Sequence, residues 1–136
     1  MDNQQRYDAG MKVRREVLGD KWVDKATNSR TTFTEEWQAH ITRFAWGEVW
    51  TRPGLDRFTR SCMTLALMMS LGRWEEFNLH VVAAFNNGLT EEEIKEVIFH
   101  AACYCGVPAG NNAFAEATKT LTEMGRPPKP LADTKG

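Results

Sequence analysis

Residues 56–88, DRFTRSCMTLALMMSLGRWEEFNLHVVAAFNNG, decide the fold class of this chain. The segment Met63–Leu71 is apolar almost all the way round a helix, which is typical of a helix buried on several sides. Gly72 interrupts this pattern, and apolar residues then recur at helical spacing until Gly88. The stretch therefore predicts two consecutive helices.

The same signals extend in both directions and predict an all-α fold. Thr90 and Glu93 form a capping box ahead of an apolar helical stripe. Thr34 precedes another stripe and has two glutamates in the following turn. No alternating run is long enough to indicate a strand. Helices are expected at about 3–18, 34–51, 56–71, 73–86, 90–105 and 111–124, with 20–32 as a polar stretch.

The composition is that of one globular domain, with 136 residues, 42% hydrophobic and 26% charged. Residues 1–125 are expected to form a bundle of six to seven short helices, followed by an extended tail over 126–136. The net charge of −1 disfavours nucleic acids and membrane surfaces as partners. Three cysteines cannot all pair and no leader is evident, so we expect a cytoplasmic protein.

The apolar content is high for short helices, with five Trp, seven Phe and six Met. Small helical domains bury a modest fraction of their surface. We therefore expect a homo-oligomer in which the apolar helix 56–71 is shared between subunits. The alternative is a compact monomer with an aromatic core.

Each of the three histidines has a glutamate four residues earlier, which gives the pairs Glu36–His40, Glu76–His80 and Glu96–His100. This spacing puts both side chains on one helix face, where the carboxylate can orient and charge the imidazole. The spacing does not select one pair. His80 borders an apolar stripe near Arg73, which favours an acid–base role. The alternative is a partly buried structural histidine.

Six arginines lie between residues 30 and 73, a region without lysine. The planar guanidinium can bind a carboxylate with two hydrogen bonds. Arg57 and Arg60 share one helix face, and Arg73 begins the next helix. The cluster suits a substrate with two carboxylates, whereas the alternative for each arginine is a salt bridge with a neighbouring acidic residue.

Metal and thiol chemistry are poorly supported by the sequence. Cys103 and Cys105 are one residue apart, which is not the usual dithiol redox spacing, and we expect both to be buried. The sequence has no His-Glu-x-x-His motif, and no glutamate lies three residues before a histidine. We therefore predict no metal site.

Several motifs extend this interpretation, among them Trp50-Thr51-Arg52-Pro53-Gly54-Leu55. The others lie at residues 6–11, 13–20, 41–48, 57 with 60–61, 75–76 with 80, 86–88, 93–97 and 104–109. Together they resemble the carboxymuconolactone decarboxylase family of alkylhydroperoxidase-like folds over about residues 6–124. Peroxidases of that superfamily carry Cys-x-x-Cys followed by a histidine. Here Arg73, Glu76 and His80 occupy that region, so disulfide reduction is not expected.

The resemblance implies a lyase that needs no cofactor and commonly assembles as a hexamer. The implied reaction converts 4-carboxymuconolactone to the 4-oxoadipate enol-lactone and CO2, in protocatechuate degradation by the β-ketoadipate pathway. The substrate is a small dicarboxylate lactone that accepts its own electrons, so the enzyme must bind carboxylates, stabilise an enolate and protonate carbon.

Within that reaction we expect His80 to deliver the proton and Glu76 to orient it. The expected substrate-binding residues are Arg57, Arg60 and Arg73 for the carboxylates and the oxyanion, with Trp46, Glu48, Tyr104 and Glu16 lining the pocket. Two alternatives stay open: a related decarboxylase or isomerase acting on another lactone, and a non-catalytic helical assembly protein with the same fold.

Overall fold

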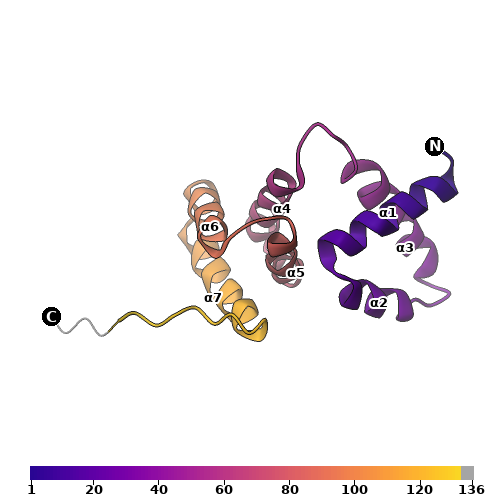
Figure 1. The fold of residues 1–136 in the computed structure, drawn as a ribbon. Helices are drawn as coiled ribbons and strands as arrows, with labels where there is room; N and C mark the ends of the chain where they lie inside the picture. Colours follow the sequence, from indigo (N-terminus) through magenta and orange to yellow (C-terminus); the bar gives the residue numbers. More distant parts are fainter. Residues whose placement is uncertain (133–136) are drawn as a thin grey trace.

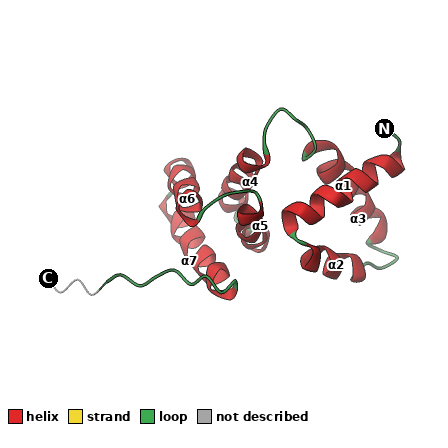
Figure 2. Ribbon diagram, viewed as in Figure 1, coloured by secondary structure: helices red, strands yellow, loops and turns green. Residues whose placement is uncertain are grey.

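The structure, a computed structural model, describes residues 1–132, and their only regular secondary structure is helical (Figures 1 and 2). The helices are α1 (Asn3–Leu18), α2 (Asp20–Asn28), α3 (Glu35–Ile41), the π-helix η1 (Thr42–Val49), α4 (Arg57–Leu71), α5 (Trp74–Asn86), α6 (Glu91–Cys105) and α7 (Val107–Glu123). The predicted all-α class is confirmed. Within residues 1–132 we find no helix whose length and apolar character would let it cross a membrane.

Several helix ends lie where the sequence signals placed them. Gly72 ends α4 with a φ of 70°, a backbone conformation that glycine adopts without strain. The capping box of α6 is formed as predicted. The Thr90 hydroxyl accepts from the Glu93 amide at 3.2 Å, and the Glu93 carboxylate accepts from the Thr90 amide at 3.0 Å.

Three expectations about the helices were wrong. The polar stretch begins with helix α2, whose only buried residue is Val23, so its sequence resembles a loop. The helix expected over 34–51 changes at Thr42 from α3 into the π-helix η1. Helix α7 begins at Val107, earlier than predicted, because Pro108 lies in its first turn, where the missing N–H costs nothing.

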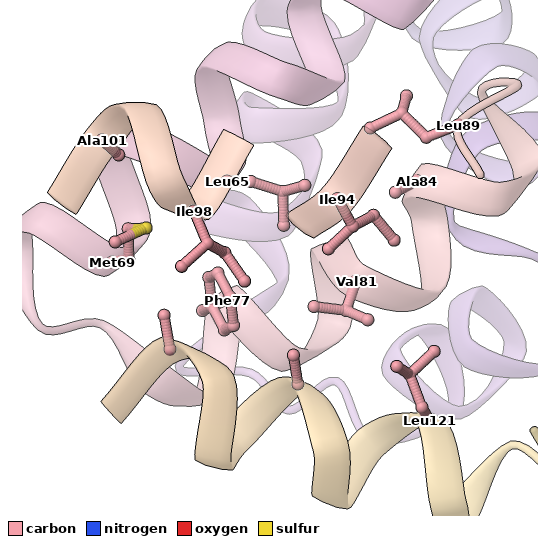
Figure 3. Packing of buried hydrophobic residues seen from close by; sticks show 12 residues of the cluster. Leu65, Met69, Phe77, Val81, Ala84, Leu89, Ile94, Ile98, Ala101 and Leu121 are labelled. Carbon is pink, nitrogen blue, oxygen red and sulfur yellow. The ribbon is translucent and has the colours of Figure 1, made fainter. Parts of the chain in front are cut away.

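Two hydrophobic cores lie on different faces of α5. The larger core joins α4, α5, α6 and α7, and Figure 3 shows its side chains, which include Leu65, Phe77, Val81, Ile98 and Leu121. The smaller core joins α1, α2, η1 and α5 through Val13, Val17, Leu18, Val23, Trp46 and Ala83. Helix α5 therefore links the two halves of the molecule that Figure 1 shows on either side of it.

Helix α1 crosses η1 at two glycines. A Cβ atom on Gly10 would overlap the carbonyl oxygen of Thr42, and a Cβ atom on Gly47 would overlap the carbonyl oxygen of Arg6. Only glycine lets the two backbones approach this closely. The crossing fixes the position of η1, and with it the tryptophans at its end, against α1.

The chain after α7 runs without regular structure over 126–132. The Arg126 guanidinium lies 4.0 Å from the centre of the Phe85 ring, which anchors the start of this segment. The boundary expected at residue 125 stays a prediction, and residues 133–136 of the expected tail lie outside the described part of the chain.

Candidate functional site

Two side-chain contacts connect helices that carry predicted site residues. They involve α1, the end of η1, the start of α4, and α5. Arg57 Nη1 lies 2.7 Å from Glu16 Oε2, which joins α4 to α1. The rings of Trp50 and His80 are stacked at 6.5 Å between centroids, which joins the end of η1 to α5. Asn86 Nδ2 donates to the Val17 carbonyl at 2.9 Å and holds α5 to α1.

His80 is neutral at neutral pH in this environment. Burial lowers its pKa from 6.5 to about 4, and this effect outweighs the opposing charge of Glu76 one turn earlier. Its Nδ1 atom is buried without a hydrogen-bond partner among the described residues, which adds to the cost of protonation. Glu76 itself is exposed. The expectation that the glutamate would charge the imidazole therefore does not describe the ligand-free protein.

This low pKa predicts a specific loss of stability in acid. Between the unfolded pKa of 6.5 and the folded pKa of about 4, the unfolded chain binds a proton that folded His80 does not. Unfolding is thus favoured as the pH falls, by about 2 kcal/mol between pH 7 and pH 4.5. Urea denaturation at fixed protein concentration should show this loss in the wild type and its absence in His80→Gln. A variant at an exposed histidine, His40→Gln, should keep the wild-type dependence, and equal slopes in all three proteins would contradict the assignment.

The ion pair between Arg57 and Glu16 is accessible to solvent. Their side chains are 41% and 40% exposed, and such a pair contributes only about 0–1 kcal/mol to stability. Asp56, an alternative partner, instead caps α4 by accepting from the Thr59 amide at 2.7 Å. The Arg57 guanidinium is therefore held by one carboxylate and still presents further donors for a ligand.

Arg60 holds the connection between η1 and α4. Its Nη2 atom donates to the Arg52 carbonyl at 3.1 Å, two residues beyond Trp50. Its Nε atom is buried and has no partner within the described chain. In this conformation Arg60 fixes the loop, whereas the sequence predicted a carboxylate-binding residue.

The remaining predicted site residues are less closely associated with this region. Arg73 and Glu48 are exposed. Tyr104 is 81% exposed near the end of α6, with its ring 5.4 Å from that of His100. Helix α6 packs on α4 and α7, and Figure 1 shows it on the opposite side of α4 and α5 from α1. Within one chain, Tyr104 is thus not brought to the α1 side of α5.

Trp46 and Trp50 complete the region around His80. Trp46 is 7% exposed and stacks on Trp50 with ring centroids 5.1 Å apart, so it supports Trp50. Trp50 belongs to the motif at residues 50–55, but it was not predicted from the sequence as a site residue. Its spacing of four residues from Trp46, which places both on one helix face, was the available signal.

The cysteines differ from their predicted burial. All three are free, with Cys103 exposed and Cys62 and Cys105 partly buried. Cys103 was expected to be a buried small residue, but it projects from the solvent side of α6, because that helix buries the face carrying Ile94, Ile98 and Ala101.

Comparisons with known proteins show the family of this chain. Residues 35–119 match the model of the Carboxymuconolactone decarboxylase family. The chain is 46% identical to a 4-carboxymuconolactone decarboxylase of Acinetobacter baylyi over 95% of this chain and 96% of that protein. It is 48% identical to a nitrosuccinic acid decarboxylase of Metarhizium robertsii, over 87% and 82% of the two chains. A shorter 4-carboxymuconolactone decarboxylase sequence from Pseudomonas putida is 54% identical over 35% of this chain and all of its own length, 100%. The chain belongs to the carboxymuconolactone decarboxylase family.

Proposed function

We propose that this protein is a carboxy-lyase that converts 4-carboxymuconolactone to the 4-oxoadipate enol-lactone and CO2. The observation that carries this proposal is the 46% identity to the Acinetobacter baylyi decarboxylase along nearly the full length of both chains. The accessible Arg57 and the titratable imidazole of His80 support it, because the reaction needs an anion-binding group and a group that can take up and deliver a proton.

The reaction needs no external electron acceptor. The bond between the ring carbon and its carboxylate breaks, and the electron pair moves through the ring double bond to the lactone carbonyl. The resulting enolate then takes up one proton at the carbon next to that carbonyl. The protein must therefore hold the carboxylates, stabilise the enolate oxygen and supply one proton in each turnover.

We assign these tasks to the residues around α5. Arg57 binds a substrate carboxylate beside Glu16, and Arg60 and Arg73 are the further candidates for the carboxylate and the oxyanion. His80 gives the proton, after the negative charges of the bound substrate have raised the pKa of its ring. Glu76 favours the same protonated form through its charge. Trp46, Glu48, Tyr104 and Glu16 remain the proposed pocket residues.

A second candidate substrate follows from the comparison with the Metarhizium robertsii protein, which is named for nitrosuccinic acid. Nitrosuccinate is also a dicarboxylate, and the carbon that loses CO2 bears a nitro group. That group takes up the electron pair as the lactone carbonyl does. The two reactions thus place the same demands on the protein, and the identities of 46% and 48% do not separate them.

A competition of substrates tests the proposal. We expect the purified protein to release CO2 from 4-carboxymuconolactone with a kcat/KM at least about 100-fold above that for nitrosuccinate. The ring fixes the double bond and the lactone carbonyl that take up the electron pair relative to the bond that breaks, whereas the acyclic acid must lose more torsional freedom on binding. CO2 release is measured for both acids with the same preparation.

The reverse preference would assign the protein to nitrosuccinate. Absence of turnover with both acids would contradict the proposal and favour another lactone or a non-catalytic assembly protein. Boiled protein corrects for the spontaneous decarboxylation of each substrate.

We further propose that the protein acts as a homo-oligomer, with a hexamer as the expected form. Met63, Leu67 and Leu71 form an apolar stripe on α4 and are 49%, 53% and 66% exposed in the single chain. Such a stripe favours burial against another subunit. Light scattering of the eluted protein tests the oligomeric state, because a mass equal to one 15.5 kDa chain would exclude an oligomer.

The free cysteines support the proposed cytoplasmic location.

A further inference from the structure

We infer that Trp50 is a positioning residue, whose indole fixes the orientation of the His80 ring and shields one face of it from water. The inference rests on the proposed role of His80 in proton transfer. It comes from three rings in a column, in which Trp46 stacks on Trp50 at 5.1 Å and 27°, and Trp50 stacks on His80 at 6.5 Å and 16°. Both separations lie in the range of offset-stacked aromatic pairs.

The indole of Trp50 is itself firmly held. Trp46 belongs to the smaller core and gives the column a buried base. The Trp50 amide donates to the Ala45 carbonyl at 2.9 Å, in the hydrogen-bond pattern of the π-helix. Thr51 Oγ1 donates to the Gly47 carbonyl at 2.9 Å. Arg60, which lies on α4, donates from its Nη2 atom to the Arg52 carbonyl. Backbone and side-chain bonds thus restrain the segment on both sides of the ring.

His80 lacks the usual means of orientation. In many catalytic histidines, one ring nitrogen is fixed by a carboxylate or a backbone carbonyl, which sets the tautomer and the ring angle. Here Nδ1 is buried, and no hydrogen-bond partner for it is present in the described chain. Stacking on Trp50 restricts the ring through its face instead, and leaves Nε2 as the nitrogen available for proton exchange.

The charges around His80 do not provide a competing restraint. Glu76, on the same helix, acts on the ring through its charge alone and less strongly than burial does. Glu16 of α1 and Arg57 of α4 pair with each other, and among the described residues no charge besides Glu76 contributes to the shift in the pKa of His80. Removing the indole would therefore admit water to the exposed ring face, and water favours the charged imidazolium.

The test is the titration of the His80 ring by NMR in three variants. The chain has only three histidines, so the His80 signal is identified by its loss in His80→Gln. In Trp50→Leu we expect the pKa of His80 to rise by at least about 1 unit, because desolvation of the ring is partly relieved. Trp50→Phe, which keeps an aromatic face, should stay within about 0.3 units of the wild type. If Trp50→Leu does not fold, Trp50→Met serves the same purpose.

The matched control is Trp37→Leu. Trp37 is also a tryptophan beside a histidine, with its ring 5.7 Å from that of His40, but the pair lies on the exposed side of α3. This change should leave the His80 titration and the turnover unchanged. In Trp50→Leu, the limiting kcat at low pH, where the His80 ring of the enzyme–substrate complex is protonated in every variant, should fall about tenfold or more with KM within about twofold, because a misplaced ring affects the proton transfer more than binding.

Two outcomes would overturn the inference. An unchanged His80 titration in Trp50→Leu would show that the indole does not shield the ring. A loss of activity equal in Trp50→Phe and Trp50→Leu, with the titration unchanged, would assign Trp50 to substrate contact. Because the titration needs no substrate, it decides the shielding even if the proposed reaction fails. Activity retained in His80→Gln would instead contradict the role of His80 and leave the shielding result intact.

Discussion

Replacing His80 with glutamine is expected to lower the kcat for CO2 release by about 10²–10⁴-fold, the usual contribution of a positioned acid. Glutamine approximates the size and polarity of the imidazole but has no group that exchanges a proton near neutral pH. KM should change little, since the arginines proposed to hold the carboxylates are unchanged. Steady-state CO2 release with purified wild-type and variant protein measures both constants.

Proton donation by His80 also predicts how kcat/KM of the wild type depends on pH. Because the pKa of His80 is about 4 in the free protein, the protonated form becomes scarcer as the pH rises above this value. We therefore expect kcat/KM to fall by about tenfold per pH unit between pH 5 and pH 8. The decline in kcat, which reports the enzyme–substrate complex, should begin at a higher pH, because the bound dianion stabilises the imidazolium.

A flat profile over this range would contradict proton donation by His80, and would assign the neutral ring as a hydrogen-bond donor to the enolate oxygen. The control variant is His40→Gln, which removes an exposed histidine that also follows a glutamate by four residues. It should retain wild-type turnover and the wild-type pH profile.

Replacing Gly47 with alanine is expected to destabilise the protein by about 3 kcal/mol, or to lower its Tm by about 10 °C. The added methyl group would overlap the Arg6 carbonyl of α1, and a backbone atom cannot move aside as a flexible side chain can. The two helices must separate, which opens the smaller core and shifts Trp46. Thermal denaturation followed by circular dichroism gives the change.

Gly54→Ala provides a control in the nearby connection to α4. A Cβ atom at Gly54 meets nothing within 4 Å, and this glycine has no positive φ. Its stability should stay within about 0.5 kcal/mol of the wild type. If Gly47→Ala were equally neutral, the close crossing of α1 and η1 would not exist in solution.

The sequence predicted those parts of the fold that have local causes. The capping box at Thr90 and the glycine at position 72 depend on interactions within a few residues, and both were read correctly. Helix α2 was missed because its stability comes from one buried residue, Val23, in contact with another part of the chain. The π-helix depends on the approach of α1 to η1 at Gly10 and Gly47, which no local pattern reveals.

The same distinction applies to the candidate site. Spacing placed Glu76 and His80 on one helix face, and the apolar stripe indicated that desolvation could change the pKa of the ring. The sequence could not show that burial outweighs the charge of Glu76, because burial is a property of the packed molecule. The partner of Arg57 was expected among nearby acidic residues and is instead Glu16, 41 positions earlier in the chain. Contacts between distant segments, such as Trp50 with His80, required the structure.

The position of α5 between two cores has a consequence for how substrate selectivity can change in this family. His80 lies on a strip of α5 between the face that enters the larger core and the face that enters the smaller one. The ring that stacks on His80 belongs to Trp50, which follows η1 and packs against the smaller core. Substitutions in the smaller core can therefore change the surroundings of His80, and with them the proposed substrate preference, while the packing of α4, α6 and α7 in the larger core is preserved.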